Sequence, residues 1–197
     1  MSTGYEFTSR SELDTAVDLW ISDESSATNT YGEINDWDVS AITDFSSLFR
    51  DKATFNSDIG NWDVSNGNDF SGIFEDATSF NQDISDWDVS KGTDFAYMFF
   101  KASDFNQDLG SWDVGNSTTF KRMFNSSAFN QDIGSWDVSQ GTDFSEMFGG
   151  TDFNQDIGNW DVSNGTDFYW MFYNADAFNQ DISSWDVSSG TNLSEMF

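Results

Sequence analysis

The chain has 197 residues, and its 35 acidic residues against seven basic ones give a formal net charge of −28. Nucleic acids and anionic membranes bind proteins through clustered cations, so neither is an expected partner, and no apolar stretch is long enough to insert into a membrane. Histidine and cysteine are absent, which removes the usual general base, the thiol nucleophile and the nitrogen ligands of metal sites. We therefore expect a protein that is not an enzyme and has no catalytic residues.

The N-terminal segment, residues 1–30, differs from the rest of the chain and is expected to form a cap. Residues 9–20 read as an amphipathic helix, and Ser9 and Glu12 have the spacing of a capping box. The polar, turn-rich residues 21–30 follow it. Solenoids need an atypical terminal cap, and this helix fits that role. The predicted apolar face of the helix consists of Leu13, Ala16, Val17 and Trp20.

From residue 31 onward the chain is a repeat. The tripeptide Trp-Asp-Val occurs seven times, and successive copies are 24 or 25 residues apart. A fixed period in this range indicates a solenoid, in which each coil buries its apolar face against its neighbours. We expect a solenoid of about seven coils over residues 31–197, the last one incomplete. The tryptophans of the motif are Trp37, Trp62, Trp87, Trp112, Trp136, Trp160 and Trp185.

Two elements are predicted inside each coil. Trp136 and Val138 alternate with polar residues, which is typical of a short half-buried strand. Phe144, Met147 and Phe148 have the i, i+3, i+4 spacing of one or two helical turns. The expected fold class is therefore an α/β repeat solenoid similar to leucine-rich repeats, with a short strand and a short helix in each coil.

The tryptophan column is expected to form the structural core of the solenoid. An exposed tryptophan stripe could stack on sugars, but it would also be a large apolar patch, so we favour the buried arrangement. A column of asparagines is expected to form an internal ladder in which side-chain amides bind backbone groups of the next coil. These asparagines are Asn56, Asn81, Asn106, Asn130, Asn154 and Asn179.

An acidic column beside the tryptophans is the candidate binding site. Alternation along the strand would point these carboxylates outward, and stacked coils would bring neighbouring charges close enough to repel. Hydrogen bonds to backbone amides and serines could offset the repulsion. The alternative is calcium bridging adjacent carboxylates, since calcium prefers oxygen ligands, although no known calcium-binding motif is present and no metal site is assigned. The column consists of Asp38, Asp63, Asp88, Asp113, Asp137, Asp161 and Asp186.

The repeat motif carries a resemblance to a known group of proteins. Phe-Asn-Gln-Asp-Ile-x-x-Trp-Asp-Val-Ser, followed by Thr-Asp-Phe-x-x-Met-Phe, closely resembles the BspA-like leucine-rich-repeat surface proteins over roughly Tyr5 to Phe197. Members of that group often have Val-Thr-x-Met where this chain has Gly141 to Phe144. The resemblance implies an extracellular or cell-surface repeat protein with an adhesive or recognition role.

The predicted function is a non-enzymatic extracellular or cell-surface module for binding or adhesion, whose partner is an unidentified protein or glycan. The alternative is a structural segment of a fibre or surface layer that assembles through its solenoid ends. The last coil at Met196 and Phe197 has no successor in the sequence, so weak self-association through this end is expected. There is no signal peptide in the chain, and we expect it to be part of a longer protein.

Overall fold

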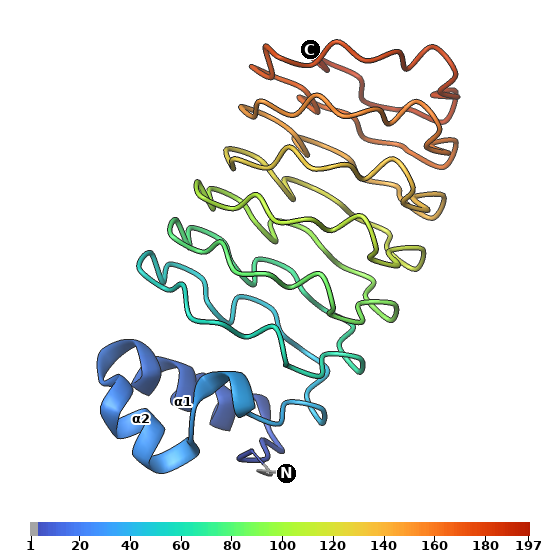
Figure 1. Ribbon diagram of the computed structural model, residues 1–197. Coiled ribbons are helices and arrows are strands. Elements are labelled where there is room, and N and C mark those ends of the chain that lie inside the picture. Colours follow the sequence, from blue (N-terminus) through green and yellow to red (C-terminus); the bar gives the residue numbers. More distant parts are fainter. Residues whose placement is uncertain (1–3) are drawn as a thin grey trace.

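The computed structural model describes residues 4–197 and shows a helical cap at one end of a stack of coils (Figure 1). The cap contains α1 (Arg10–Ser22), α2 (Glu24–Tyr31) and the 3₁₀-helix η1 (Ile34–Asp36). Within the described residues no helix is both long and apolar enough to cross a bilayer. Residues 1–3 of the expected 1–30 cap lie outside the described part of the chain.

Helix α1 occupies the segment expected to be helical and begins one residue after its cap. The hydroxyl of Ser9 accepts a hydrogen bond from the backbone N–H of Glu12 at 3.3 Å, which satisfies one of the free donors of the first turn. The Glu12 carboxylate does not complete a reciprocal capping box but accepts a hydrogen bond from the Tyr5 hydroxyl at 2.6 Å. All four residues of the expected apolar face are buried, namely Leu13, Ala16, Val17 and Trp20.

The second helix differs from the sequence-based expectation, which left residues 21–30 as a turn-rich segment. Asp23 ends α1 and begins α2, because its side chain accepts a hydrogen bond from the backbone N–H of Ser26 at 3.1 Å. The helix is short and polar, and Ala27 is its one fully buried residue. A good N-cap and one buried contact are enough to stabilise a helix whose composition alone gives no amphipathic signal.

The cap is attached to the first two coils by polar bonds as well as by its apolar face. The Arg10 guanidinium lies 3.2 Å from the Asp44 carboxylate and 2.6 Å from the carbonyl oxygen of Ser46. The indole N–H of Trp20 donates to the hydroxyl of Ser57 at 3.0 Å. The backbone around Glu6 pairs with Asp38 in a parallel bridge, so the N-terminal segment continues the stack below the first coil.

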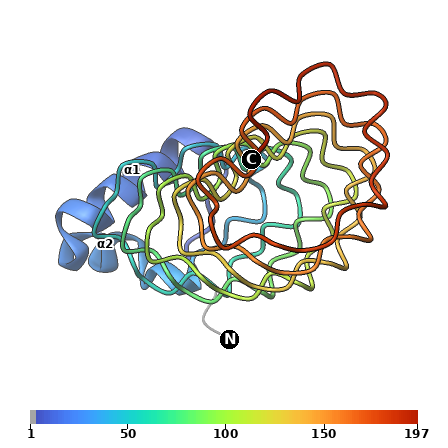
Figure 2. The same cartoon turned by 90° about the horizontal axis from the view of Figure 1, so that it is seen from above.

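We number the coils 1 to 7, beginning at residues 31, 55, 80, 105, 129, 153 and 178. Seen from above, they follow one another as similar outlines, each slightly shifted from the last (Figure 2). Neighbouring coils run parallel and in register, because a single parallel bridge joins each coil to the next at the same repeat position. The bridged residues are Asp44, Asp69, Asp94, Thr119, Asp143, Asp167 and Asn192.

The expected strand and helix of each coil are absent, so the prediction of an α/β solenoid was wrong. In residues 31–197 the structure has isolated bridges and turns, with η1 as the only helix that begins in this range. The N–H groups of Phe144, Glu146 and Phe148 donate to carbonyls of coil 6 at 2.8–2.9 Å, whereas that of Met147 donates back to Phe144 at 3.2 Å. Glu146 also has a φ of 58°, which an α-helix does not allow. Every second N–H group of this segment thus donates to the next coil. An α-helix would need all of these N–H groups to donate within their own coil.

The alternating segment around Trp136 shows why its period resembled that of a strand. Trp136 and Val138 are buried and Asp137 is exposed, as in a half-buried strand. However, the backbone N–H of Trp136 donates to the carbonyl of Ile133 at 3.1 Å, which closes a turn inside the coil. The period of two therefore shows which side chains face inward. It does not correspond to a β-ladder between coils at this position.

The core is a set of aromatic columns running along the stack. The tryptophans from Trp37 to Trp160 are 2–4% exposed, whereas Trp185 in the last coil is partly buried. Each indole N–H from Trp62 to Trp185 donates at 2.7–3.1 Å to the carbonyl oxygen of the Ile or Leu that precedes the previous tryptophan. A phenylalanine column stacks beside it, with ring centroids 5.5–5.9 Å apart, and consists of Phe49, Phe74, Phe99, Phe124, Phe148 and Phe172.

Replacing Trp112 by phenylalanine tests whether the indole bond stabilises the stack. The substitution removes a donor that lies 3.1 Å from the Ile84 carbonyl oxygen in the core, and a buried acceptor left unpaired costs about 1–3 kcal/mol. We expect the free energy of unfolding in urea, followed by circular dichroism, to fall by about that amount. The control is Trp185→Phe in the more exposed last coil, where water can replace the donor. Equal losses at the two positions would contradict this account.

Candidate functional site

The acidic column that the sequence suggested as a binding site caps turns of the backbone. In every coil the Oδ1 atom of this aspartate accepts a hydrogen bond from the backbone N–H two residues later, at 2.9–3.1 Å. This Asx-turn is a common way for aspartate to fix a bend. The residues that form it are Asp38, Asp63, Asp88, Asp113, Asp137, Asp161 and Asp186.

These hydrogen bonds also favour the ionised form of several carboxylates of the column. The Ser139 hydroxyl, followed by the Ser139 backbone N–H, lowers the pKa of Asp137. The same two kinds of donor lower the pKa of Asp38 and of Asp88. A lowered folded-state pKa means that the carboxylate adds stability above the ordinary aspartate pKa, and that this stability is lost as the pH falls through the folded-state value. The charge of the column is thus part of the scaffold.

The calcium alternative finds no cluster of ligands. Among residues 4–197 no group of three or more acidic side chains is placed so that it could hold a metal ion.

The asparagine column has a structural role too, but on the surface and not in the interior. The Oδ1 atom of each asparagine from Asn56 to Asn154 accepts the backbone N–H of the asparagine one coil further on, at 2.9–3.0 Å, and the last N–H in this ladder is that of Asn179.

A different surface carries the residues that distinguish one coil from another. Each coil has a Phe-x-x-Met-Phe segment or a close variant of it. The two positions before its methionine and the two positions after the segment vary from coil to coil in charge, size and aromaticity. We call these 26 positions the variable face. They are residues 46, 47, 50, 51, 71, 72, 75, 76, 96, 97, 100, 101, 121, 122, 125, 126, 145, 146, 149, 150, 169, 170, 173, 174, 194 and 195.

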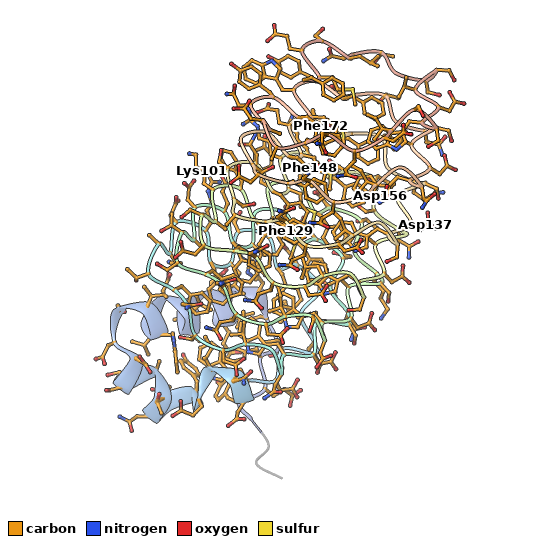
Figure 3. The ribbon with its side chains drawn as sticks, turned by 45° about the horizontal axis from the view of Figure 1, so that its top comes forward. Lys101, Phe129, Asp137, Phe148, Asp156 and Phe172 are labelled. Atoms are coloured by element: carbon orange, nitrogen blue, oxygen red, sulfur yellow. The ribbon has the colours of Figure 1, made fainter. Side chains whose placement is uncertain are left out.

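The variable face concentrates the side chains that bind partners most often. Four of the seven basic residues lie on it, Arg50, Lys101, Lys121 and Arg122. So do five aromatic residues outside the core columns, Tyr97, Phe100, Tyr169, Trp170 and Tyr173. Figure 3 shows Lys101 on one side of the stack and Asp137 and Asp156 on the opposite side, with Phe129, Phe148 and Phe172 between them. The variable face and the acidic columns are thus separate surfaces.

Several bulky residues of this face have an unfavourable backbone conformation. The second variable position of each coil has a φ of 50–60°, and it is occupied by Tyr97, Arg122 and Trp170 in coils 3, 4 and 6. Coil 2 has Gly72 at this position. A left-handed conformation costs a residue with a Cβ atom roughly 1–2 kcal/mol. The chain therefore keeps large side chains at positions where glycine would fit better.

The first cluster on the variable face is centred on Arg122. Its guanidinium lies 5.6 Å from the ring centroids of both Tyr97 and Phe100, and its Nη2 atom is 2.6 Å from Oε1 of the buried Glu146. The hydrogen bond that Arg122 donates to the Glu146 carboxylate raises the pKa of Arg122 above its ordinary value. The arginine is thus held in place as a fixed cation between two rings and a carboxylate.

The second cluster is an aromatic stack in coil 6. The Trp170 ring lies 4.8 Å from that of Tyr169 and 4.4 Å from that of Tyr173, with interplanar angles of 16° and 13°. The Trp170 indole N–H donates to the carboxylate of Glu195 at 2.8 Å, which fixes its orientation. A cavity of about 220 Å³ opens beside the stack. It is lined by Asn125, Ser126, Glu146, Gly149, Gly150, Trp170, Tyr173 and Asn174.

Sequence reasoning missed the variable face because it considered only residues that repeat. The useful signal was the opposite, namely the positions at which seven otherwise similar copies differ. Trp170 also gave a specific signal, since it is one of only two tryptophans outside the Trp-Asp-Val register, the other being Trp20 in the cap. The amino-acid sequence displays both signals directly.

Substitutions of Asp137 separate the structural role of the acidic column from its charge. Asp137→Ala removes the acceptor for the Ser139 N–H, and we expect the free energy of unfolding at pH 7 to fall by about 0.5–1 kcal/mol. Asp137→Asn keeps an acceptor and removes one negative charge, so its stability should stay close to that of the parent. The difference between the parent and Asp137→Ala should shrink below the ordinary aspartate pKa of about 3.9. Equal destabilisation by both variants would show that the charge matters and the turn does not.

Comparison with known sequences gives a family but no activity. A sequence model of the family described as "Mycoplasma protein of unknown function, DUF285" matches residues 21–128 and 112–197. No curated protein and no solved structure matches the chain. The family description does not mention leucine-rich repeats, so the resemblance to BspA-like proteins stays a prediction. Because the two matches together span residues 21–197, the chain belongs to the DUF285 family.

Proposed function

We propose that the chain is a non-enzymatic binding module that recognises a protein or glycan partner through its variable face. The observation that carries this proposal is that four of the seven basic residues, and the five aromatic residues of the coils that lie outside the core columns, share one face of a regular scaffold. Binding residues are commonly placed at variable positions of a rigid framework, where they change without disturbing the core. Aromatic residues and arginine are also the side chains most enriched at the energetic centres of interfaces.

The strained conformations of the variable face support this proposal. Tyr97, Arg122 and Trp170 each have positive φ, although Gly72 fills the equivalent place in coil 2. Such conformations persist where the surrounding structure imposes them, and they cluster at binding and catalytic sites. The three residues contribute little to the aromatic columns of the core, since all are only partly buried. A role in recognition accounts for them better than a role in folding.

The charge of the molecule favours some partners over others. Three of the four basic groups of the variable face are paired with carboxylates: Arg50 with Glu75 at 3.3 Å, Lys101 with Asp76 at 3.6 Å and Arg122 with Glu146 at 2.6 Å. The fourth, Lys121, does not make a cationic patch by itself, and the net charge of −28 repels a polyanion. An uncharged or basic partner on a cell surface or in the extracellular space suits this face, which agrees with the location implied by the resemblance to BspA-like proteins.

An array of glycans and extracellular-matrix proteins tests the proposal when the parent chain is compared with two variants. The first variant replaces the exposed aromatic residues by residues that other coils carry at the same positions: Tyr97→Gly, Phe100→Gly, Tyr169→Ser, Trp170→Gly and Tyr173→Gly. The second, matched control replaces five acidic-column residues while keeping the turn acceptors: Asp63→Asn, Asp88→Asn, Asp113→Asn, Asp137→Asn and Asp161→Asn.

We expect the parent to bind at least one array component, and the aromatic variant to bind it roughly tenfold or more weakly. The control should bind about as well as the parent. Both variants should unfold cooperatively, because neither alters the core columns. Loss of binding in the acidic control with retention in the aromatic variant would overturn the assignment of the variable face.

Assembly through the open end of the solenoid is a second candidate, favoured by the exposed apolar residues of the last coil. Leu193 is 40% exposed and Phe197 is 69% exposed, whereas equivalent residues of inner coils are fully buried. At the opposite end α1 and α2 form the helical cap beside the first coils (Figure 1). Contact between two last coils would give a closed dimer.

Sedimentation equilibrium over a range of concentrations tests this second candidate. We expect weak, reversible dimerisation that is lost in Leu193→Asp, because a charge at the centre of the apolar end opposes its burial. The variant Asp186→Asn, which alters an exposed residue of the same coil, should dimerise like the parent. A monomer at all concentrations, or an open series of larger species, would contradict dimerisation through this end.

A further inference from the structure

We infer that the cavity across coils 4 to 6 of the variable face is a binding site for a single uncharged sugar ring. This inference rests on the proposed function and specifies the chemical class of one ligand. The cavity is lined on one side by Asn125 and Ser126 and on the other by Trp170, Tyr173 and Asn174. Its chemical composition, its size and its origin in the repeat all point to the same class.

The cavity exists because coil 5 lacks side chains at two variable positions. The third position is occupied by Asn125, Gly149 and Tyr173 in coils 4, 5 and 6, so glycine lies between two larger residues. The fourth position follows the same order, with Ser126, Gly150 and Asn174. A Cβ atom on Gly149 would lie only 2.7 Å from the Asn125 amide nitrogen. The two glycines thus form a floor between walls supplied by the neighbouring coils.

The walls offer the two kinds of contact that a sugar needs. Trp170 is stacked between Tyr169 and Tyr173, so the outer face of Tyr173, which is 37% exposed, is the aromatic surface against which the C–H face of a pyranose can pack. The side chains of Asn125, Ser126 and Asn174 supply amide and hydroxyl groups that both donate and accept hydrogen bonds, as sugar hydroxyls require. Ser126 Oγ donates to Asn125 Oδ1 at 2.8 Å, and Asn125 Nδ2 donates to the Glu146 carbonyl at 3.3 Å, so one wall is already ordered.

Charge argues for a neutral ligand over an ionic one. The one carboxylate that lines the cavity, that of Glu146, is bonded to the Arg122 guanidinium at 2.6 Å. An anion would meet no free cation there and would be repelled by the net charge of −28. A quaternary ammonium needs ring faces arranged around it. The rings in coil 6 are stacked on one another at 4.4 and 4.8 Å and do not surround a cation.

The size of the cavity selects a single ring. Its volume of about 220 Å³ lies below the roughly 300–1,000 Å³ of sites for drug-sized ligands and cofactors. A site with so few contacts binds weakly, and we expect a dissociation constant of about 1 mM for one sugar.

Saturation-transfer NMR and titration calorimetry test the inference with the methyl glycosides of glucose, galactose, mannose and N-acetylglucosamine as probes. Two variants alter the site in opposite ways. Tyr173→Gly removes part of the aromatic wall, whereas Gly150→Asn fills the cavity with the residue that coil 6 carries at that position, and asparagine tolerates the φ of 66° found there. The control is Asp137→Asn, which alters the acidic column of coil 5, outside both the cavity and the variable face.

We expect at least one glycoside to bind the parent and the Asp137→Asn control equally, and to bind both cavity variants roughly tenfold or more weakly. Circular dichroism shows whether each variant is folded. If Tyr173→Gly and Gly150→Asn, which change the cavity in opposite ways, both weaken binding, an indirect effect of either substitution is excluded. Absence of binding by all four glycosides, or preferential binding of tetramethylammonium, would overturn the inference. Arrays that still showed a protein partner sensitive to the variable face would leave the proposed function standing while this inference failed. If the glycosides did not bind and the arrays also showed no such partner, both the proposed function and this inference would be overturned.

Discussion

The structure depends on one arrangement of backbone hydrogen bonds. Along each Phe-x-x-Met-Phe segment, alternate N–H groups donate to the next coil and the intervening ones close turns within their own coil, as Glu146 and Met147 show. The bonds between coils place identical repeat positions directly above one another. Stacked phenylalanines, the tryptophan indole bonds and the asparagine ladder all follow from that register. The left-handed residues of the variable face are a consequence too, because successive turns require positive φ at fixed places.

This arrangement divides the surface by function. Asp137 and its counterparts bind the backbone of their own turns, and Asn106 and its counterparts bind the backbone of the next coil. Such residues repeat because every coil has the same groups to satisfy. The side chains of the variable face do not have to satisfy backbone groups, because the backbone there is already hydrogen-bonded and these side chains point away from the columns. Differences can accumulate there without loss of the fold, and this freedom is what makes the face suitable for recognition.

The open cavity shows what a change within the regular repeat can produce. Gly149 and Gly150 interrupt columns of larger side chains and create a hollow with defined walls, without any change in the path of the chain. A hollow of this kind suits a small ligand.

The sequence by itself determined the period, the number of coils, the inward direction of the tryptophans and the helix that begins the cap. These features depend on local spacing and on apolar periodicity, which a single chain displays directly. It could not determine the secondary structure of the coils. The i, i+3, i+4 pattern of Phe144, Met147 and Phe148 fits a helix as well as a series of turns, and only the bonds to coil 6 select the turns. The tertiary structure likewise decided the role of the acidic column and brought Asn125, Gly149 and Tyr173 together, because these contacts join residues about 24 positions apart.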